Sequence, residues 1–467
     1  MLTEEGWLIR DVEILDAQFK PARVDVRLAG GRLAEIGSLS PVSGEQVVEA
    51  DGRLLLPGIH DHHVHLAAMA ASLSSVDCSP AAVASPEELA ASLHDQPGTD
   101  WLRGIGYHES VAGPLDRDWL DRHGPDRPVR IQHRTGTLWI VNTRGLDILR
   151  KLAASTLSDA DFSGRLASDG RLYDCDDLIG LTRQEPPIGT VSQQLSSWGV
   201  TGVNDMTVSN DPHTLDWFDR LQRNGELLQR VRLSGAASLP THQDAWLGVG
   251  ETKIYLHDHQ LPVFAEMVLQ IRGSHLVNRP VAIHCVTEAE LVFSLAALEE
   301  GGLLPGDRIE HGSVIPDALL PMIRSADLLV VTQPNFVAER GDTYLAEVPV
   351  DQHPLLYRCR SLIESGIRVA FGTDMPFGHP DPWRAMAAAT RRTTADGVLL
   401  GAGETVTPEM ALSAFLGELA SPATPRILSV GADADLCLMD LPWTRLREDL
   451  DSRHVVQTWV NGRSVYG

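Results

Sequence analysis

Two histidines spaced two residues apart are the first feature of this sequence that could do chemistry. His63 and His65 follow the apolar run 54–56 and a Pro57-Gly58 break. On a strand, residues i and i+2 face the same side, so both imidazoles could reach one cation. Imidazole is a ligand for zinc, iron, nickel and similar metals. A His-x-His pair alone is a weak signal, but its place at the end of an apolar run strengthens it.

Four further candidates lie at other short apolar runs of the chain. They are Lys253, His284, His311 and Asp374. Each has an ordinary structural interpretation when taken singly: a strand-end histidine is usually hydrogen-bonded within the fold, an aspartate after a strand often caps a helix, and a lysine is usually solvated. Taken together, the histidines and the aspartate share one chemistry, which is metal ligation. The sequence therefore predicts a metal site if the fold brings these runs together.

Eight apolar runs that alternate with helix-like segments must position these side chains. The runs are 54–65, 200–203, 231–233, 253–256, 280–284, 308–311, 328–332 and 368–372. Repetition of strand and helix with buried-type strands indicates a parallel sheet. Eight such units predict a closed (β/α)8 TIM barrel of the α/β class, in which the carboxyl ends of the strands converge on one face. An open, doubly wound sheet is the alternative architecture.

The two ends of the chain and a long internal segment differ from the barrel pattern. Residues 1–56 and 425–467 contain short alternating runs and tight Gly-Gly and Asn-Gly turns, which predict one small composite β-sandwich built from both ends. Residues 57–424 form the expected barrel. Residues 66–190 fit neither pattern, and we expect them to be a large insertion after the first barrel strand.

The composition excludes several classes of partner. The chain has 467 residues, 63 of them acidic and 39 basic, and a formal net charge of −24. Nucleic acids and anionic membranes require a basic face, so neither is an expected partner. Five cysteines without a Cys-x-x-Cys spacing indicate a reducing compartment. No signal-like apolar segment or membrane span is evident. We expect a cytoplasmic protein that acts on a small molecule, and homo-oligomer formation stays open.

The ordered set of motifs resembles the metal-dependent amidohydrolase superfamily, family 3 type. It is most similar to the branch that includes N-substituted formamide deformylase. The motifs that carry the resemblance are Pro57-Gly58-x-x-Asp61-x-His63-x-His65, Lys253-Ile-Tyr-Leu, Ile-His284-Cys, Arg308-Ile-Glu-His311-Gly and Gly372-Thr-Asp374-x-Pro376. The resemblance spans nearly the whole chain and is thinnest over residues 66–190.

The resemblance implies two divalent metal ions, expected to be zinc, with manganese, iron or nickel as alternatives. The implied ligands are His63, His65 and Asp374 for one ion, His284 and His311 for the other, and Lys253 as a bridge. Lys253 would be carboxylated by CO₂, because an unmodified lysine is a cation with donors only, whereas a carbamate offers two oxygens and a negative charge. Carbamate formation needs the neutral amine, which burial favours.

The resemblance also implies hydrolysis of a carbon–nitrogen bond outside ordinary peptides, in an amide, cyclic amide, carbamate or N-formyl compound. A metal-activated water would attack the carbonyl, and Asp374 would take its proton and pass it to the leaving nitrogen. Two alternatives stay open. A hydrolytic deaminase of a nitrogen heterocycle commonly needs one metal and no bridging lysine, and a catalytically inactive barrel would act as a binding protein.

Four residues are candidates for substrate contacts, namely Tyr107, Thr137, Tyr255 and His257. Thr137 stands where relatives of this branch often carry histidine, so the substrate of the branch cannot be transferred to this chain. Tyr255 and His257 share strand parity with Lys253 and could face the pocket, with packing inside the barrel as the alternative. Tyr107 lies in an aromatic patch of the insertion that could form a lid over the pocket or part of the insertion's own core.

Overall fold

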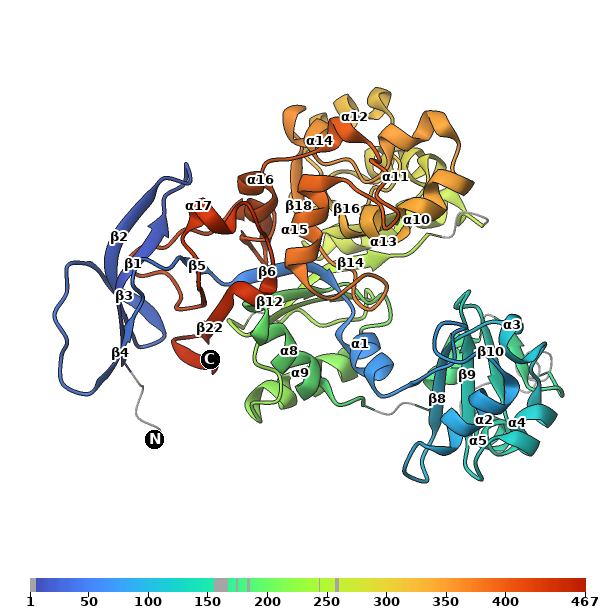
Figure 1. Cartoon of the computed structure of the whole chain (residues 1–467). Helices are drawn as coiled ribbons and strands as arrows, with labels where there is room; N and C mark the ends of the chain where they lie inside the picture. The colour runs from blue at the N-terminus through green and yellow to red at the C-terminus, as the bar shows by residue number, and fades with distance from the viewer. Residues whose placement is uncertain (1–5, 155–166, 174, 183–184, 243, 257–259) are drawn as a thin grey trace. The chain divides into compact units, whose positions relative to one another are not determined.

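The structure is a computed structural model that describes residues 6–154, 167–173, 175–182, 185–242, 244–256 and 260–467 (Figure 1). The chain divides into two compact units. One unit comprises Met1–Leu66 together with Ile188–Gly467, and the other comprises Ala67–Pro187. The residues predicted to bind metal all belong to the first unit.

Eight parallel strands form the central sheet of the first unit. In sheet order they are β6 (Ile59–Val64), β12 (Val200–Asp205), β13 (Arg230–Gly235), β14 (Leu247–Ile254), β15 (Val281–Cys285), β16 (Arg308–His311), β17 (Leu329–Thr332) and β18 (Arg368–Phe371). Neighbouring strands pair in parallel throughout. The sheet order follows the chain without a reversal, as in a (β/α)8 barrel and unlike a doubly wound sheet. The expected eight strands and the barrel class are confirmed.

The first and last strands of the sheet meet at their carboxyl ends. Val64 forms a parallel bridge with Met375. The amide of His65 donates to the Met375 carbonyl at 2.9 Å, and the amide of Asp374 donates to the His63 carbonyl at 2.8 Å. These bonds nearly close the sheet and bring the residues that follow β18 beside those that end β6.

The predicted first strand, 54–65, is two strands in the structure. β5 (Leu55–Pro57) pairs antiparallel with β21 (Leu436–Met439) of a different sheet, and β6 begins only at Ile59. Gly58 separates the two strands, and a Cβ atom at this position would come within 2.2 Å of the Thr201 side chain. The sequence pattern does not show where the chain passes from one sheet to the other, because both strands are buried and form one continuous apolar run.

The fourth barrel strand is longer than its apolar run. β14 begins at Leu247, well before Lys253, and its sequence includes Gly248, Gly250 and the polar pair Glu251-Thr252. These residues do not match an apolar pattern. Lys253 therefore lies near the carboxyl end of its strand, which is the end that faces the mouth of a barrel.

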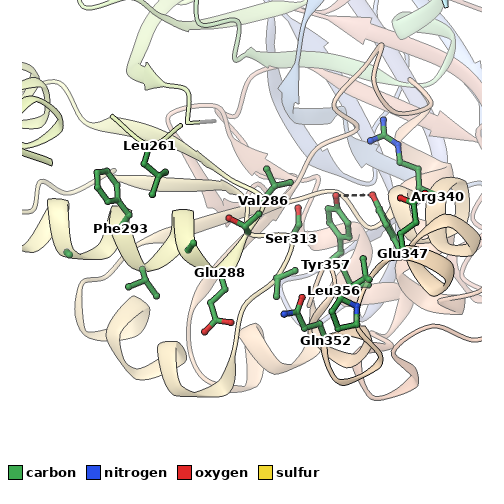
Figure 2. Close-up of a pocket in the computed structure, with 18 of the residues that line it drawn as sticks. Leu261, Val286, Glu288, Phe293, Ser313, Arg340, Glu347, Gln352, Leu356 and Tyr357 are labelled. Carbon is green, nitrogen blue, oxygen red and sulfur yellow. Dashed lines mark hydrogen bonds between the residues drawn. The ribbon is translucent and has the colours of Figure 1, made fainter. Parts of the chain in front are cut away.

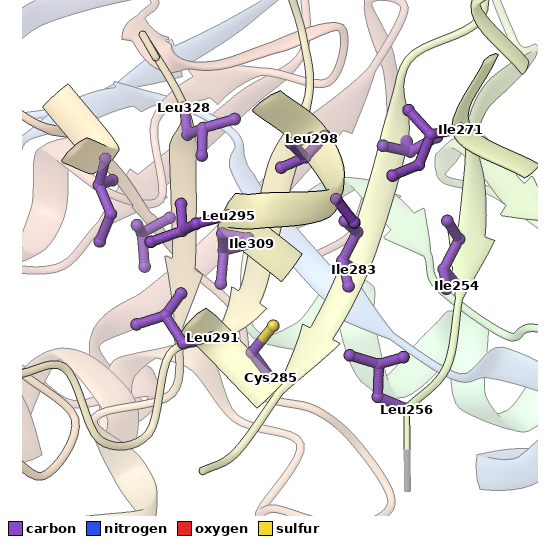
Figure 3. Close-up of a cluster of buried hydrophobic side chains, with 14 of the residues drawn as sticks. Ile254, Leu256, Ile271, Ile283, Cys285, Leu291, Leu295, Leu298, Ile309 and Leu328 are labelled. Atoms are coloured by element: carbon purple, nitrogen blue, oxygen red, sulfur yellow. The ribbon is translucent and has the colours of Figure 1, made fainter. Parts of the chain in front are cut away.

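Helices between the strands pack their apolar side chains on the barrel. They are α8 (Ile188–Ser197), α9 (Pro212–Arg223), α10 (Phe264–Leu276), α11 (Glu288–Gly301), α12 (Leu320–Ser325), α13 (Asn335–Glu347), α14 (Arg360–Glu364), α15 (Pro382–Arg391) and α16 (Pro408–Ser413). Leu291, Leu295 and Leu298 of α11 belong to one buried cluster with Ile283 of β15 and Ile309 of β16 (Figure 3). A capping box at Thr287 starts α11 directly after β15.

Two four-stranded sheets from the chain ends also belong to the first unit. One has the order β3 (Arg32–Gly37), β2 (Pro21–Ala29), β1 (Gly6–Leu15), β4 (Glu45–Glu49), and the other β23 (Arg463–Tyr466), β22 (Val455–Val460), β21, β5. One apolar cluster contains residues from both sheets. Within it, the rings of Trp7 and Trp459 pack edge to face with centroids 5.7 Å apart.

The second unit has a sheet and a core of its own. The sheet order is β11 (Arg171–Tyr173), β10 (Leu138–Val141), β9 (Val129–His133), β8 (Leu102–Tyr107), β7 (Val76–Asp77). The longer helices here are α2 (Pro86–His94), α4 (Arg117–His123) and α5 (Thr143–Ala154). In the ranges that the structure describes, none of the helices combines the length and the apolar character needed to cross a bilayer.

We expect the α11 core to dominate the stability of the barrel half that contains Lys253 and His284. Leu298→Ala should lower the free energy of unfolding by about 2–5 kcal/mol, because the Leu298 side chain is 1% exposed and its loss leaves a cavity. Leu276→Ala is the matched control, since Leu276 ends α10 and is 87% exposed. Denaturant unfolding followed by circular dichroism measures both. Equal losses in the two variants would contradict the described packing.

Candidate metal centre

Three predicted ligands meet at the mouth of the barrel. His63, His311 and Asp374 are buried and each offers one ligand atom, and these three atoms lie within 4.8 Å of one another. The His63 Nε2 atom is 3.6 Å from Asp374 Oδ1. The three residues come from β6, β16 and the segment after β18, so the barrel alone brings them together.

Two further predicted ligands adjoin this group. His65 Nε2 lies 3.1 Å from Asp374 Oδ1. The His284 ring, at the end of β15, lies with its centroid 4.4 Å from that of His311. The histidine–aspartate cluster therefore comprises His63, His65, His284, His311 and Asp374. Its donors are imidazole nitrogens and carboxylate oxygens, which suit zinc and similar divalent ions.

Lys253 is buried close to the histidine–aspartate cluster. Its Nζ atom has no hydrogen-bond partner among the described residues. Burial lowers the pKa of Lys253, partly opposed by the negative charges of Glu310 and Asp374. A buried ammonium without a partner is costly. The surroundings of Nζ therefore fit an amine that has lost its proton or carries a further group better than a free cation.

Two residues of the cluster have left-handed backbone conformations. His311 has φ 67° and Asp374 has φ 58°. Such conformations cost non-glycine residues roughly 1–3 kcal/mol each and persist only when their surroundings hold them. The Asp374 amide is held by the His63 carbonyl. The strained backbone conformations thus fall on two residues that contribute atoms to the cluster.

Polar side chains orient the histidines through their Nδ1 atoms. His63 Nδ1 is 2.6 Å from Glu310 Oε2, His65 Nδ1 is 2.9 Å from Thr207 Oγ1, and His311 Nδ1 is 2.8 Å from Gln333 Oε1. With Nδ1 engaged, Nε2 is the nitrogen left for a metal. Sequence reasoning missed these three partners. Glu310 precedes His311 in a quoted motif, but Thr207 and Gln333 give no local signal.

The Glu310 carboxylate also pairs with the Arg308 guanidinium, and both side chains are fully buried. Arg308 in turn donates to the His62 carbonyl at 2.8 Å. This chain of contacts links β16 to β6 inside the barrel. Removing one member would leave a buried charge without its partner, which is strongly destabilising.

Asp61 holds the segment that carries Asp374. Its carboxylate accepts hydrogen bonds from the Thr373 amide at 3.0 Å, the Thr373 hydroxyl at 2.6 Å and the His63 amide at 3.2 Å. Burial raises the pKa of Asp61 to about 7 in spite of these bonds. The sequence motif contained Asp61, but its role as a brace between β6 and Thr373 follows only from the fold.

The protonation states favour metal ligation. Burial lowers the pKa of His63 well below its usual value and also lowers the pKa values of His284 and His311. Neutral imidazole is the form that binds metals. Burial would raise the pKa of Asp374, but the neighbouring imidazoles of His65, His63 and His311 outweigh it and hold that pKa below its usual range. Asp374 is therefore a carboxylate at neutral pH.

The predicted substrate contacts fall in different places. Tyr255 is 46% exposed, and its ring centroid is 4.3 Å from that of His284. That exposure does not fit packing inside the barrel. Phe377, which the sequence did not indicate, is 58% exposed and lies 5.5 Å from the His65 ring. Two exposed aromatic rings thus lie against the histidine–aspartate cluster.

The geometry of the histidine–aspartate cluster does not test the remaining candidates for substrate contact. Tyr107 and Thr137 belong to the second unit. Tyr107 is buried in the core of that unit, and its hydroxyl donates to the Gly113 carbonyl. Thr137 is exposed, with its hydroxyl 3.3 Å from that of Thr135. His257 lies outside the described residues. Substrate contact by these three residues stays a prediction.

A parallel eight-stranded barrel with histidines and an aspartate gathered at the carboxyl ends of its strands defines a class of barrel hydrolase. Within that class, the chain belongs to the amidohydrolase family, whose model matches residues 46–466. The family expected from the motifs is confirmed. Membership makes the chain a hydrolase of carbon–nitrogen bonds other than peptide bonds.

Known proteins similar to this chain span nearly its full length. N-substituted formamide deformylase of Arthrobacter pascens is 22% identical over 97% of this chain and 98% of its own. The putative amidohydrolase YtcJ of Bacillus subtilis is 23% identical over 90% of each chain. An uncharacterized metal-dependent hydrolase from Pyrococcus horikoshii has a TM-score of 0.80 at 20% identity, covering 95% of this chain and 99% of its own. That structural likeness supports the fold.

Thr207→Val should weaken metal binding by about 10- to 100-fold, because His65 loses the hydrogen-bond partner that orients its ring. Thr201→Val is the matched control. Thr201 is on the same strand-and-loop segment, but its hydroxyl has no hydrogen-bond partner among the described residues. Competition with a zinc chelator measures the affinity of each variant. Unchanged affinity in Thr207→Val would show that His65 does not depend on this bond for ligation.

Proposed function

We propose that this chain hydrolyses an amide, cyclic amide, carbamate or N-formyl bond of a small molecule, with divalent metal ions held in the histidine–aspartate cluster. The observation that supports it most directly is the convergence of His63, His311 and Asp374, with ligand atoms within 4.8 Å. The second is the buried Nζ atom of Lys253 beside them, which has no hydrogen-bond partner in the part of the chain that the structure describes. N-formyl compounds enter the proposal through the similarity to the Arthrobacter deformylase.

The residues present fit a pair of ions. In this proposal His63, His65 and Asp374 would hold one ion, His284 and His311 would hold the other, and a carboxylated Lys253 would supply oxygen ligands to both. Zinc suits this nitrogen and oxygen ligand set, and manganese, iron or nickel are alternatives. When bound, such ions lower the pKa of water and polarise a carbonyl oxygen.

Asp374 is the proposed proton carrier of the reaction. It is anionic at neutral pH, so it can accept the proton of the attacking water and then pass it to the leaving nitrogen. His65 Nε2 lies 3.1 Å from Oδ1 of Asp374, so both atoms are close enough to share one ion. The exposed rings of Tyr255 and Phe377 lie against His284 and His65 and would cover the apolar parts of a bound substrate.

The surroundings of Lys253 favour this proposal over a deaminase. A one-metal deaminase does not need a bridging lysine, yet here a lysine lies near the end of β14 with its amine buried beside the cluster. The presence of all six expected side chains likewise argues against a barrel that only binds a ligand.

The domain organisation, the cellular location and the oligomeric state of the chain also belong to this proposal. We propose that residues 1–56 and 425–467 form a composite β-sandwich domain and that 57–424, with the insertion at 66–190, form the hydrolase barrel. A cytoplasmic location and homo-oligomer formation stay predictions.

Asp374→Asn should reduce kcat by about 10²- to 10⁴-fold, because an amide cannot accept the proton. We would measure amine or ammonia release from a panel of N-formyl, N-acyl, cyclic amide and carbamate compounds, with metal content determined in parallel. Asp396→Asn, at an exposed position, is the control and should retain wild-type turnover. Wild-type turnover in Asp374→Asn would remove the proton-carrier role, and a wild-type protein that binds no metal would overturn the proposed function.

Carboxylation of Lys253 can be tested without signals from many other lysines, because the chain contains only three, Lys20, Lys151 and Lys253. Lys20 and Lys151 are both exposed. A Lys20→Arg/Lys151→Arg variant prepared with zinc and ¹³CO₂ should show one carbamate signal by ¹³C NMR. Adding Lys253→Met should abolish it. A zinc-loaded protein without this signal would contradict the bridging carbamate.

A further inference from the structure

Residues 373–379, the Asp374 segment, follow β18 and carry the aspartate of the histidine–aspartate cluster. The segment is neither helix nor strand. The amides of Phe377 and Gly378 donate to the Asp374 carbonyl at 2.8 and 3.0 Å, and these bonds form a tight turn. Such a turn defines the local shape of the segment, but contacts with other elements must fix its position relative to the barrel strands.

Asn335, the first residue of α13, holds the start of the Asp374 segment. Its side-chain amide donates to the Thr373 carbonyl at 3.1 Å and to Glu339 Oε1 at 3.2 Å. Asn335 is 1% exposed, so its bond to the residue before Asp374 is shielded from water. Thr373 is therefore held on two sides, by Asn335 through its carbonyl and by Asp61 through its amide and hydroxyl.

The contact between α13 and the Asp374 segment is closest at Gly378. A Cβ atom at this position would come within 2.3 Å of Asn335 Nδ2 and of the Thr373 carbonyl oxygen, and within 3.0 Å of the Phe336 ring. A side chain at residue 378 would therefore push Asn335 away from the carbonyl that it holds. The absence of a side chain on Gly378 is what allows α13 and the segment to approach each other.

Two charged residues on the next turn of α13 hold the other end of the Asp374 segment. The Glu339 carboxylate accepts from the His379 amide, at 3.1 Å through Oε1 and at 3.2 Å through Oε2. Arg340 donates to the Phe377 carbonyl, and its guanidinium carbon lies 4.1 Å from the centre of the Phe336 ring. Contacts from one helix thus reach the segment on both sides of the aspartate.

We propose that Asn335 and Glu339 are positioning residues, which hold the Asp374 carboxylate where the reaction requires it. The inference deepens the proposed function and rests on it for the role of Asp374. A misplacement of about 1 Å at a reacting group can cost roughly 100-fold in rate. Asn335 and Glu339 act through the backbone of Thr373 and His379, so their effect should appear in turnover more than in substrate binding.

Glu339 offers the sharper test, because it is exposed and its replacement leaves the buried core intact. Glu339→Ala removes the acceptor for the His379 amide, whereas Glu339→Gln keeps an acceptor oxygen and removes only the charge. Glu347→Ala is the matched control, since Glu347 is an exposed glutamate at the other end of α13. In Figure 2, Glu347 and Arg340 lie beside a cavity of about 1210 Å³ that both residues line.

Turnover of an N-formyl compound is measured at saturating zinc. We expect Glu339→Ala to lower kcat by about 10- to 100-fold and to leave KM within about 2-fold of wild type. Glu339→Gln should recover most of kcat, and Glu347→Ala should match wild type. Wild-type kcat in Glu339→Ala would overturn the proposal. An equal loss in Glu339→Gln would also overturn it, because the charge and not the hydrogen bond would then matter.

Two measurements that need no turnover separate this inference from the proposed function. Hydrogen exchange over residues 372–381, followed by mass spectrometry, should be faster in Glu339→Ala and in Gly378→Ala, and zinc should bind about 10-fold more weakly to both. Unchanged exchange and zinc affinity in Glu339→Ala would overturn the positioning role. If the expected changes occur but the wild-type enzyme hydrolyses no amide, the positioning role is supported and the proposed function is contradicted.

Discussion

The seam between the first and last barrel strands is the constraint on which the candidate metal centre depends. Hydrogen bonds from the Asp374 amide to His63 and from the His65 amide to Met375 join the two strand ends. The Asp61 carboxylate adds two more by accepting from the amide and the hydroxyl of Thr373. His63 and Asp374, which are far apart in the sequence, are brought together where this seam closes.

Several features around the cluster are unfavourable for stability when considered alone. His311 and Asp374 have strained backbone conformations. The buried amine of Lys253 has no hydrogen-bond partner among the residues with a described structure, and the Arg308–Glu310 pair is fully buried. Each would weaken an ordinary core. Their concentration at one end of the barrel is typical of a functional site, where stability is exchanged for a fixed arrangement of reactive groups. The packed apolar cluster around α11 supports that arrangement from outside.

Reactivity and selectivity come from different parts of the fold. The candidate metal ligands lie at strand ends or just after them, where the barrel leaves little freedom of position. The exposed rings beside the cluster, Tyr255 and Phe377, belong to the segments that follow β14 and β18. Loops and helix faces tolerate substitution far better than strand ends. A chain that is only 22% identical to its deformylase relative can therefore share the ligands and differ in the substrate that it accepts.

The sequence by itself determined the class of fold and the candidate ligands, because both depend on patterns within short segments of the chain. Apolar runs mark buried strands, and each ligand lies at or next to such a run. The apolar pattern placed the start of the fourth barrel strand at Lys253, whereas β14 begins at Leu247, because its glycines and polar residues do not form an apolar run. The same pattern treated β5 and β6 as one strand across Gly58.

Only the tertiary structure decided which residues orient the ligands and where a substrate could bind. Thr207, Gln333 and Glu310 reach the histidines across strands, and Phe377 lies against His65 from the segment after β18. The spacing of residues along the chain does not predict such pairs, because contacts between distant residues depend on the closure and packing of the barrel.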